Sequence, residues 1–259
     1  MRKRFLPLNT KFDRFIEYMG GLAVLLIRTI AWGFRPPFKK KQLVEQMSKI
    51  GVDSLFIVFL TAFFTGIVLA FQTAYTMRQM SAEIYIASLV ALSITRELGP
   101  VLTALVVAAR VGASITAEVG TMKVTEQIDA LETLATNPIK YLVVPRFLAL
   151  TLMLPLLTIY ADFVGMCGGL LVGVSKLHLT PALYLKKTFD SLEYKDMFTG
   201  LLKSVVFAAI ISIVACYEGM KTQGGAEGVG KSTTLSVVIS CVLVIASDCF
   251  FTALFYFMF

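Results

Sequence analysis

The sequence predicts an all-α integral membrane protein with about five transmembrane helices. Of its 259 residues, 57% are hydrophobic and only 16% are charged. The mean hydropathy of +0.77 lies above the range of a soluble domain with a solvated surface. Five apolar stretches reach the roughly 20 residues that a spanning helix needs; they are approximately residues 52–75, 84–109, 146–174, 198–217 and 235–258. The polar remainder is short, so we expect residues 1–259 to form one transmembrane domain.

The basic N-terminal segment, residues 1–45, is expected to carry an amphipathic helix before the first span. Apolar residues recur there at helical spacing from Phe12 to Ile30, with charged residues on the other faces. Arg28 interrupts the apolar run and a Pro-Pro pair ends it, which favours a helix lying in the cytoplasmic interface. The alternative is a sixth, short spanning helix.

The distribution of basic residues predicts the topology. Most of the 24 lysines and arginines precede the first span or lie in loops on the same side, while Arg96 and Lys203 fall inside spans. By the positive-inside rule, the N-terminus is cytoplasmic and the C-terminus is on the opposite side. Orientation and anionic lipid therefore account for the net charge of +7, with no need for nucleic acid.

No catalytic, metal or cofactor site can be assembled from the sequence. The single histidine, His178, has no nucleophile or metal ligand within reach in the sequence. Free cysteines are usually buried in proteins. The chain has four cysteines, and we expect all of them to be small core residues because they fall in or beside apolar spans: Cys167, Cys216, Cys241 and Cys249. We therefore expect no enzyme activity in this chain.

The cytoplasmic loop of residues 111–144 is expected to contain a short helix bounded by Gly120 and Pro138. One face is apolar and the other is acidic; the apolar face has Val124, Ile128, Leu131 and Leu134, and the acidic face has Glu126, Asp129 and Glu132. Because an anionic bilayer repels acidic helices, this helix suits a protein partner better than lipid. A solvated helix without a partner is the alternative.

Charged residues inside the spans are the candidate site. Arg96 and Glu97 lie near the middle of the second span, Lys203 about a turn into the fourth and Asp248 near the middle of the fifth. A charged group in the bilayer is costly unless it faces protein or water, so these four residues could form a polar pocket for a ligand's headgroup. The alternative is a set of buried ion pairs, such as Glu97 with Lys203, that only fixes helix register. Asp162 in the third span is a weaker candidate.

Two glycine patterns have different meanings. Gly165, Gly169 and Gly173 recur every four residues in the third span, which is typical of close helix packing. Residues 225–232 match the phosphate-binding pattern G-x-x-x-x-G-K-S. That mechanism needs a preceding strand and a nucleotide-binding sheet, which this chain cannot build, so we expect these residues to form a turning loop instead.

Several segments together resemble the MlaE or YrbE type of permease, which is associated with MCE proteins. They are LSITRELGPVLTALVVAARVGASITAEVGTMKVTEQIDALETLATNPIKYLVVPR, GMCGGLLVGVS, LLKSVVFA and GAEGVGKSTTLSVV. The resemblance implies the membrane subunit of an ABC transporter for phospholipids in the bacterial inner membrane, maintaining outer-membrane lipid asymmetry. The implied partners are a second copy of the chain, cytoplasmic ATPase subunits, a periplasmic MCE-domain protein and a small STAS-type cytoplasmic subunit.

The resemblance also implies roles for particular residues. The helix around Thr121 to Leu134 corresponds to the coupling helix that docks on the ATPase. The family's lipid pocket at the dimer interface corresponds to Arg96, Glu97 and Lys203, with Asp248 at the matching acidic position of the last span. Two other functions are kept as alternatives, an ion-driven carrier and a structural membrane subunit without a substrate site.

Overall fold

The computed structural model describes residues 11–33, 40–79, 82–177 and 179–258, and this part of the chain contains helices but no strands. His178 and the Pro-Pro pair at 36–37 lie outside it. The α-helices are α1 (Lys11–Gly33), α2 (Lys40–Gly51), α3 (Leu55–Gln79), α4 (Ile86–Ser93), α5 (Gly99–Val107), α6 (Ala113–Val124), α7 (Gln127–Thr133), α8 (Val144–Ser175), α9 (Pro181–Ser191), α10 (Tyr194–Lys221) and α11 (Gly225–Met258). Three π-helical segments join some of them: η3 (Ile94–Leu98), η4 (Ala108–Gly112) and η5 (Ile139–Val143).

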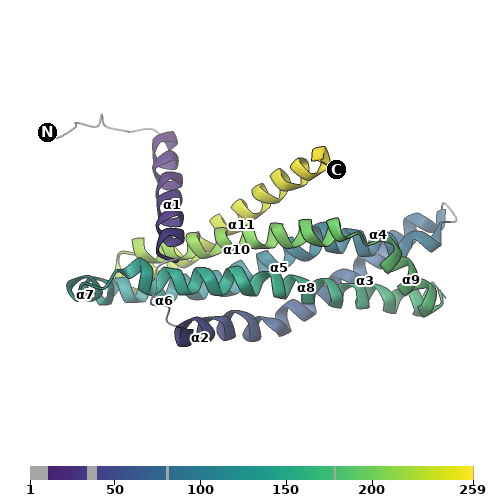
Figure 1. Cartoon of the computed structure of the whole chain (residues 1–259), viewed down its shortest axis with the longest axis horizontal. Helices are drawn as coiled ribbons and strands as arrows, with labels where there is room; N and C mark the ends of the chain where they lie inside the picture. The colour runs from purple at the N-terminus through teal and green to yellow at the C-terminus, as the bar shows by residue number, and fades with distance from the viewer. Residues whose placement is uncertain (1–10, 34–39, 80–81, 178, 259) are drawn as a thin grey trace.

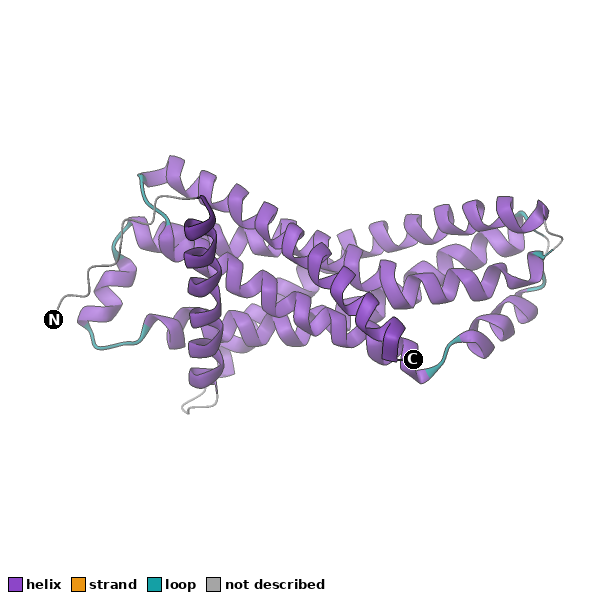
Figure 2. Ribbon diagram, turned by 90° about the horizontal axis from the view of Figure 1, so that it is seen from above, coloured by secondary structure: helices purple, strands orange, loops and turns teal. Residues whose placement is uncertain are grey.

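Six helical stretches within the described residues are long and apolar enough to cross a membrane. Five of them form an elongated bundle, made by α2 with α3, by α4 through α6, and by α8, α10 and α11 (Figure 1). The sixth is α1, which runs crosswise to the bundle in both views (Figures 1 and 2). The expected all-α membrane fold is confirmed, and the direction of α1 is the one expected for a helix lying in the interface.

One face of α1 packs on the bundle and the other is exposed. Leu22 and Leu25 are buried, while Ile27 on another face is 66% exposed. The Tyr18 hydroxyl donates a hydrogen bond of 2.6 Å to Glu218 of α10. This contact fixes α1 across the end of the bundle that also holds α7 (Figure 1).

The second span extends further than the hydropathy predicted. Helical structure continues from Ile86 to Val124, so residues 113–124 belong to α6 rather than to a loop. Small and hydroxyl side chains allow α6 to approach α10 and α11 closely: the Thr116 hydroxyl lies 3.1 Å from the Ala215 carbonyl and 2.8 Å from the Ser236 hydroxyl. These polar residues lower the hydropathy and thereby hide the continuation of the helix.

The glycine-rich segment at 225–232 is also helical, and the expectation of a loop there was wrong. The turn is made by Gly224 and Gly225, whose φ angles of 88° and 69° are unfavourable for residues with a Cβ. Residues from Gly225 onward form the first turns of α11, where Lys231 pairs with Glu227 at 2.7 Å. The lysine is thus engaged on its own helix.

Close packing of α8 depends on its glycines. A Cβ on Gly66 of α3 would collide with the carbonyl of Gly165, so the two backbones touch there. Gly169 and Gly173 instead lie against Tyr184 of α9. This glycine stripe therefore packs within one subunit.

The cysteines differ in their surroundings. Cys216 is buried, and Cys167 and Cys241 are half-buried. Cys249 is exposed on α11, which corrects the expectation that all four are core residues. Hydropathy alone does not separate the lipid-facing side of a spanning helix from the side that faces protein.

Candidate functional site

The charged residues of the second span lie in a π-helical turn. Segment η3 comprises Ile94–Leu98 and includes Arg96 and Glu97; Pro100 follows in the first turn of α5. Proline has no amide hydrogen to donate, so the regular hydrogen-bond ladder is already interrupted here. Helix α10 comes close to this turn at Gly200, where a Cβ would collide with the Thr95 carbonyl. Lys203 follows one turn later on α10, facing the same region.

Lys203 is the centre of a compact polar cluster. Its Nζ lies 2.8 Å from Glu97 Oε2 and 3.0 Å from Asp248 Oδ1, and its side chain is only 2% exposed. It also donates hydrogen bonds to the Thr252 hydroxyl at 2.8 Å and to the Arg96 carbonyl at 3.2 Å. One buried cation thus holds together the second, fourth and fifth spans, and two carboxylates surround it.

Thr252 completes the cluster, and sequence reasoning missed it. Its hydroxyl lies 3.0 Å from Glu97 Oε1 as well as 2.8 Å from the Lys203 ammonium. Its only sequence signal was its position four residues after Asp248, which places both side chains on one face of α11.

Arg96 pairs with a different residue. Its guanidinium lies 2.5 Å from Asp196 Oδ1, and the Asp196 side chain is 3% exposed. The other carboxylate oxygen of Asp196 accepts a hydrogen bond of 3.1 Å from the Glu193 amide as part of the cap of α10. Two separate ion-paired groups therefore flank η3, one built on Lys203 and one on Asp196.

Both groups are open on one side of the chain. The side chains of Arg96 and Glu97 are 56% and 38% exposed, and Asp248 is 20% exposed. They belong to helices long and apolar enough to cross a membrane. Because a charged group inside a spanning helix is costly unless it faces protein or water, we expect this side of the chain to face protein or water rather than hydrocarbon.

Asp162 lies apart from the Lys203 cluster. Its carboxylate lies against Gly99, where a Cβ would collide with it. Its Oδ1 is buried and has no hydrogen-bond partner among the described residues. The structure therefore does not bring this residue to the other four intramembrane charges.

The expected coupling segment forms α7 and its two ends. Ile128 is buried against the bundle, whereas Leu134 is 75% exposed. Asp129 pairs with Lys123 at 2.7 Å, and Glu126 and Ala135 have positive φ angles of 60° and 56°. A positive φ costs a residue with a Cβ about 1–3 kcal/mol, so the surrounding structure must hold both positions in place. Leu131 is half-buried and Glu132 is exposed, which leaves an acidic, accessible end of the bundle.

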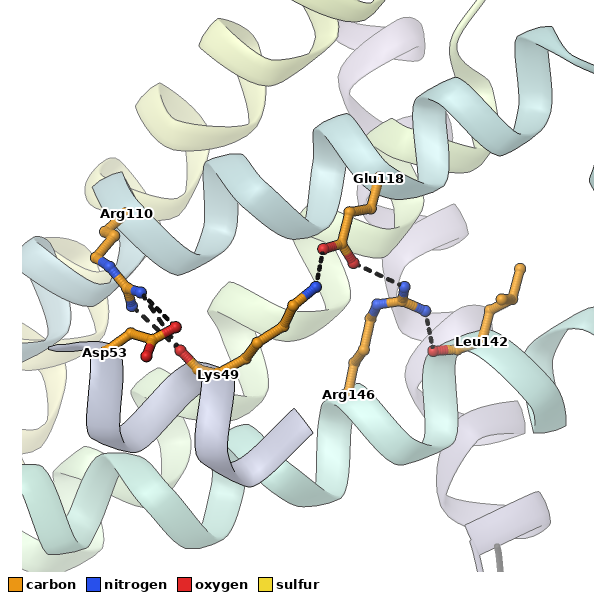
Figure 3. Close-up of polar contacts among 6 residues, drawn as sticks. All are labelled: Lys49, Asp53, Arg110, Glu118, Leu142 and Arg146. Carbon is orange, nitrogen blue, oxygen red and sulfur yellow. Dashed lines mark hydrogen bonds and ion pairs between the residues drawn. The ribbon is translucent and has the colours of Figure 1, made fainter. Parts of the chain in front are cut away.

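A second polar cluster joins α2 to α6 and α8 (Figure 3). Glu118 of α6 lies 2.6 Å from Lys49 and 3.1 Å from Arg146, whose side chain is 7% exposed. Arg110 pairs with Asp53 at 3.4 Å. Sequence reasoning had treated the basic members only as loop charges that set the topology.

This second cluster borders a cavity of about 230 Å³ between α2 and the second span. Arg110 also donates a hydrogen bond of 2.7 Å to the Ser54 hydroxyl, and Arg146 donates one of 2.9 Å to the Leu142 carbonyl. The helices that precede and follow α7, α6 and α8, are thus connected by charged side chains.

The chain is similar to known permeases over most of its length. The profile of the family described as Permease MlaE matches residues 43–254. A probable ABC transporter permease of Rickettsia conorii is 47% identical over 243 residues, 94% of each chain. One from Synechocystis is 46% identical over 211 residues, covering 82% of this chain and 80% of its own. One from Pyropia yezoensis is 42% identical, covering 97% of this chain and 95% of its own.

Proposed function

Because this chain belongs to the MlaE permease family, whose relatives include probable ABC transporter permeases, we propose that it moves phospholipids across or out of the bacterial inner membrane. ATP is hydrolysed by separate cytoplasmic subunits, and the lipid headgroup binds at the intramembrane charges. Membership in a family of ABC permeases favours this over an ion-driven carrier.

The observation that carries the proposal is the Lys203 cluster. A lysine that is 2% exposed lies between Glu97 and Asp248, while both carboxylates remain partly accessible from outside the chain. A cluster that serves only to fix helix register needs no accessible carboxylates. Accessible carboxylates and the exposed Arg96 guanidinium offer both signs of charge to a phospholipid headgroup.

A second copy of the chain is the best occupant of the open side. Arg96 and Glu97 cannot face acyl chains without a large penalty, which on insertion scales is at least about 2.5 kcal/mol for a charged residue at the helix centre. A symmetric partner would cover both residues and turn two open half-sites into one enclosed pocket. Asp248 belongs to α11. Only 11% of the residues in the most apolar 18-residue stretch of this helix are buried within the chain, so α11 is available for that contact.

The two ends of the bundle suit different partners. The end with α7 offers Glu126, Asp129 and Glu132 and is proposed to dock on the ATPase, with a STAS-type subunit as a further cytoplasmic component. The opposite end holds α9 (Figure 1), where Phe189 is 71% exposed and Tyr194 is 94% exposed. These aromatic residues are proposed to meet a periplasmic MCE-domain carrier, which would link transport to outer-membrane lipid asymmetry.

The test is purification in mild detergent followed by reconstitution. We expect the tagged chain to copurify as a dimer with an ATPase and bound phospholipid, and the complex to transfer labelled phospholipid from proteoliposomes when ATP is supplied. Lys203→Ala and Glu97→Ala should abolish transfer without preventing membrane insertion. Lys176→Ala, at an exposed position at the end of α8, is the matched control. A lipid-free monomer, or full transfer by both pocket variants, would contradict the proposal.

A further inference from the structure

A large cavity lies between the crosswise helix α1 and the coupling helix α7. Its volume is about 780 Å³, within the range of small-molecule sites. The walls come from α1, α7, the segment after α7, and α10; among the apolar lining residues are Val24, Leu25, Ile128, Ile139 and Met220. This cavity is separate from the Lys203 cluster, with which it shares no residue.

Two charged side chains of opposite sign line the cavity. Arg28 from α1 and Glu132 from α7 both line it, and within the described residues neither side chain makes an ion pair or hydrogen bond. The third charged lining residue, Lys123, is already paired with Asp129 at 2.7 Å. The cavity therefore offers one free guanidinium on one wall and one free carboxylate on another.

We propose that this cavity binds the headgroup of a zwitterionic phospholipid with a primary amine. The Arg28 guanidinium would bind the phosphate, for which its planar array of donors is well suited. The Glu132 carboxylate would accept hydrogen bonds from the ammonium group. The apolar lining would contact the glycerol and the first methylene groups. An anionic headgroup without an amine leaves Glu132 unpaired, and a free phosphate leaves the apolar lining unused.

The position of α1 supports a lipid as the occupant. Its direction across the bundle (Figure 1) and its exposed apolar residues, including Ile27, are those of a helix that lies in the plane of the interface, where phosphate groups of the bilayer are found. A headgroup between α1 and α7 would connect the interface directly to the coupling segment. Ala135, whose φ of 56° disfavours a residue with a Cβ, also lines the cavity, so α7 is held in a strained geometry at this wall.

The experiment uses the full-length chain in phosphatidylcholine nanodiscs that contain a phosphatidylethanolamine with a diazirine near the glycerol. After irradiation, mass spectrometry locates the adducts. We expect labelling at residues 20–28 and 135–139, reduced about tenfold in Arg28→Gln and in Glu132→Gln, as for the loss of a charge-assisted hydrogen bond. Glu17→Gln, at an exposed position on α1, is the matched control and should label normally.

Three results would overturn the proposal. The first is wild-type labelling that is absent from these segments or unchanged in Arg28→Gln. The second is equal competition by unlabelled phosphatidylglycerol and phosphatidylethanolamine, because the amine would then contribute nothing. The third is complete loss of labelling when the copurifying ATPase is added, which would make a protein surface the occupant. Labelling should persist in Lys203→Ala, so a failure of the transport proposal is distinguishable from a failure of this one.

Discussion

Replacing Glu118 with glutamine should destabilise the protein far more than removing its more exposed partner, Lys49. Glu118 pairs with two cations, Lys49 at 2.6 Å and Arg146 at 3.1 Å. Lys49 is 52% exposed, so its pair is worth about 0.5 kcal/mol after screening. Arg146 is 7% exposed and would be left without a counter-charge. Breaking a buried pair costs about 3–5 kcal/mol, and the 32% exposure of Glu118 reduces this to about 2 kcal/mol.

The assay is thermal unfolding of the full-length chain in detergent micelles, followed by loss of the helical circular dichroism signal. At about 2–4 °C per kcal/mol for a chain of this size, Glu118→Gln should lower Tm by about 4–8 °C, and Lys49→Met by about 1–2 °C. The double variant Glu118→Gln with Arg146→Met should lose less than the sum of the single losses, because no buried charge is then left alone. Equal effects of Glu118→Gln and Lys49→Met would refute this reasoning.

Three further predictions address other parts of the chain. Lys203→Met should lower Tm in the same assay by leaving two carboxylates beside each other, and adding Glu97→Gln should restore part of the loss; no restoration would show that the two side chains are not coupled. Gly66→Leu should prevent the close contact with Gly165 and reduce the yield of folded protein in size-exclusion chromatography, whereas an unchanged elution profile would contradict the observed packing. Ala135→Gly should raise Tm, since glycine adopts a positive φ without the strain of about 1 kcal/mol, and a lower Tm would refute that account.

The fold followed from hydropathy because burial in lipid is the dominant physical constraint on this chain. The exception was α6, where Thr116 and its polar neighbours pack against other helices rather than lipid. A sliding hydropathy average cannot distinguish such a buried, hydrogen-bonded helix from a loop. The same limit explains residues 225–232, where glycines suggested a loop but only Gly224 and Gly225 make the turn.

The candidate site was predictable in part. The cost of charge inside the membrane pointed to Arg96, Glu97, Lys203 and Asp248, and the structure brings the last three together. The partner of Arg96 could not be predicted, because Asp196 lies at the start of α10 and its carboxylate serves as a helix cap as well. Pairings between residues 100 positions apart depend on how helices are aligned lengthwise, and no local pattern encodes that alignment.

The π-helical turns have a further consequence for the second span. Each π turn contains one residue more than an α-helical turn, so everything after it is rotated by about 100° relative to an uninterrupted α-helix. The span contains two of these insertions, Ile94–Leu98 and Ala108–Gly112. Deleting one residue in the first would still permit regular helical bonding, but Arg110 and Glu118 would then point away from α2. The number of residues in this span, and not only their hydrophobicity, therefore determines which charges meet at the end of the bundle that carries α7.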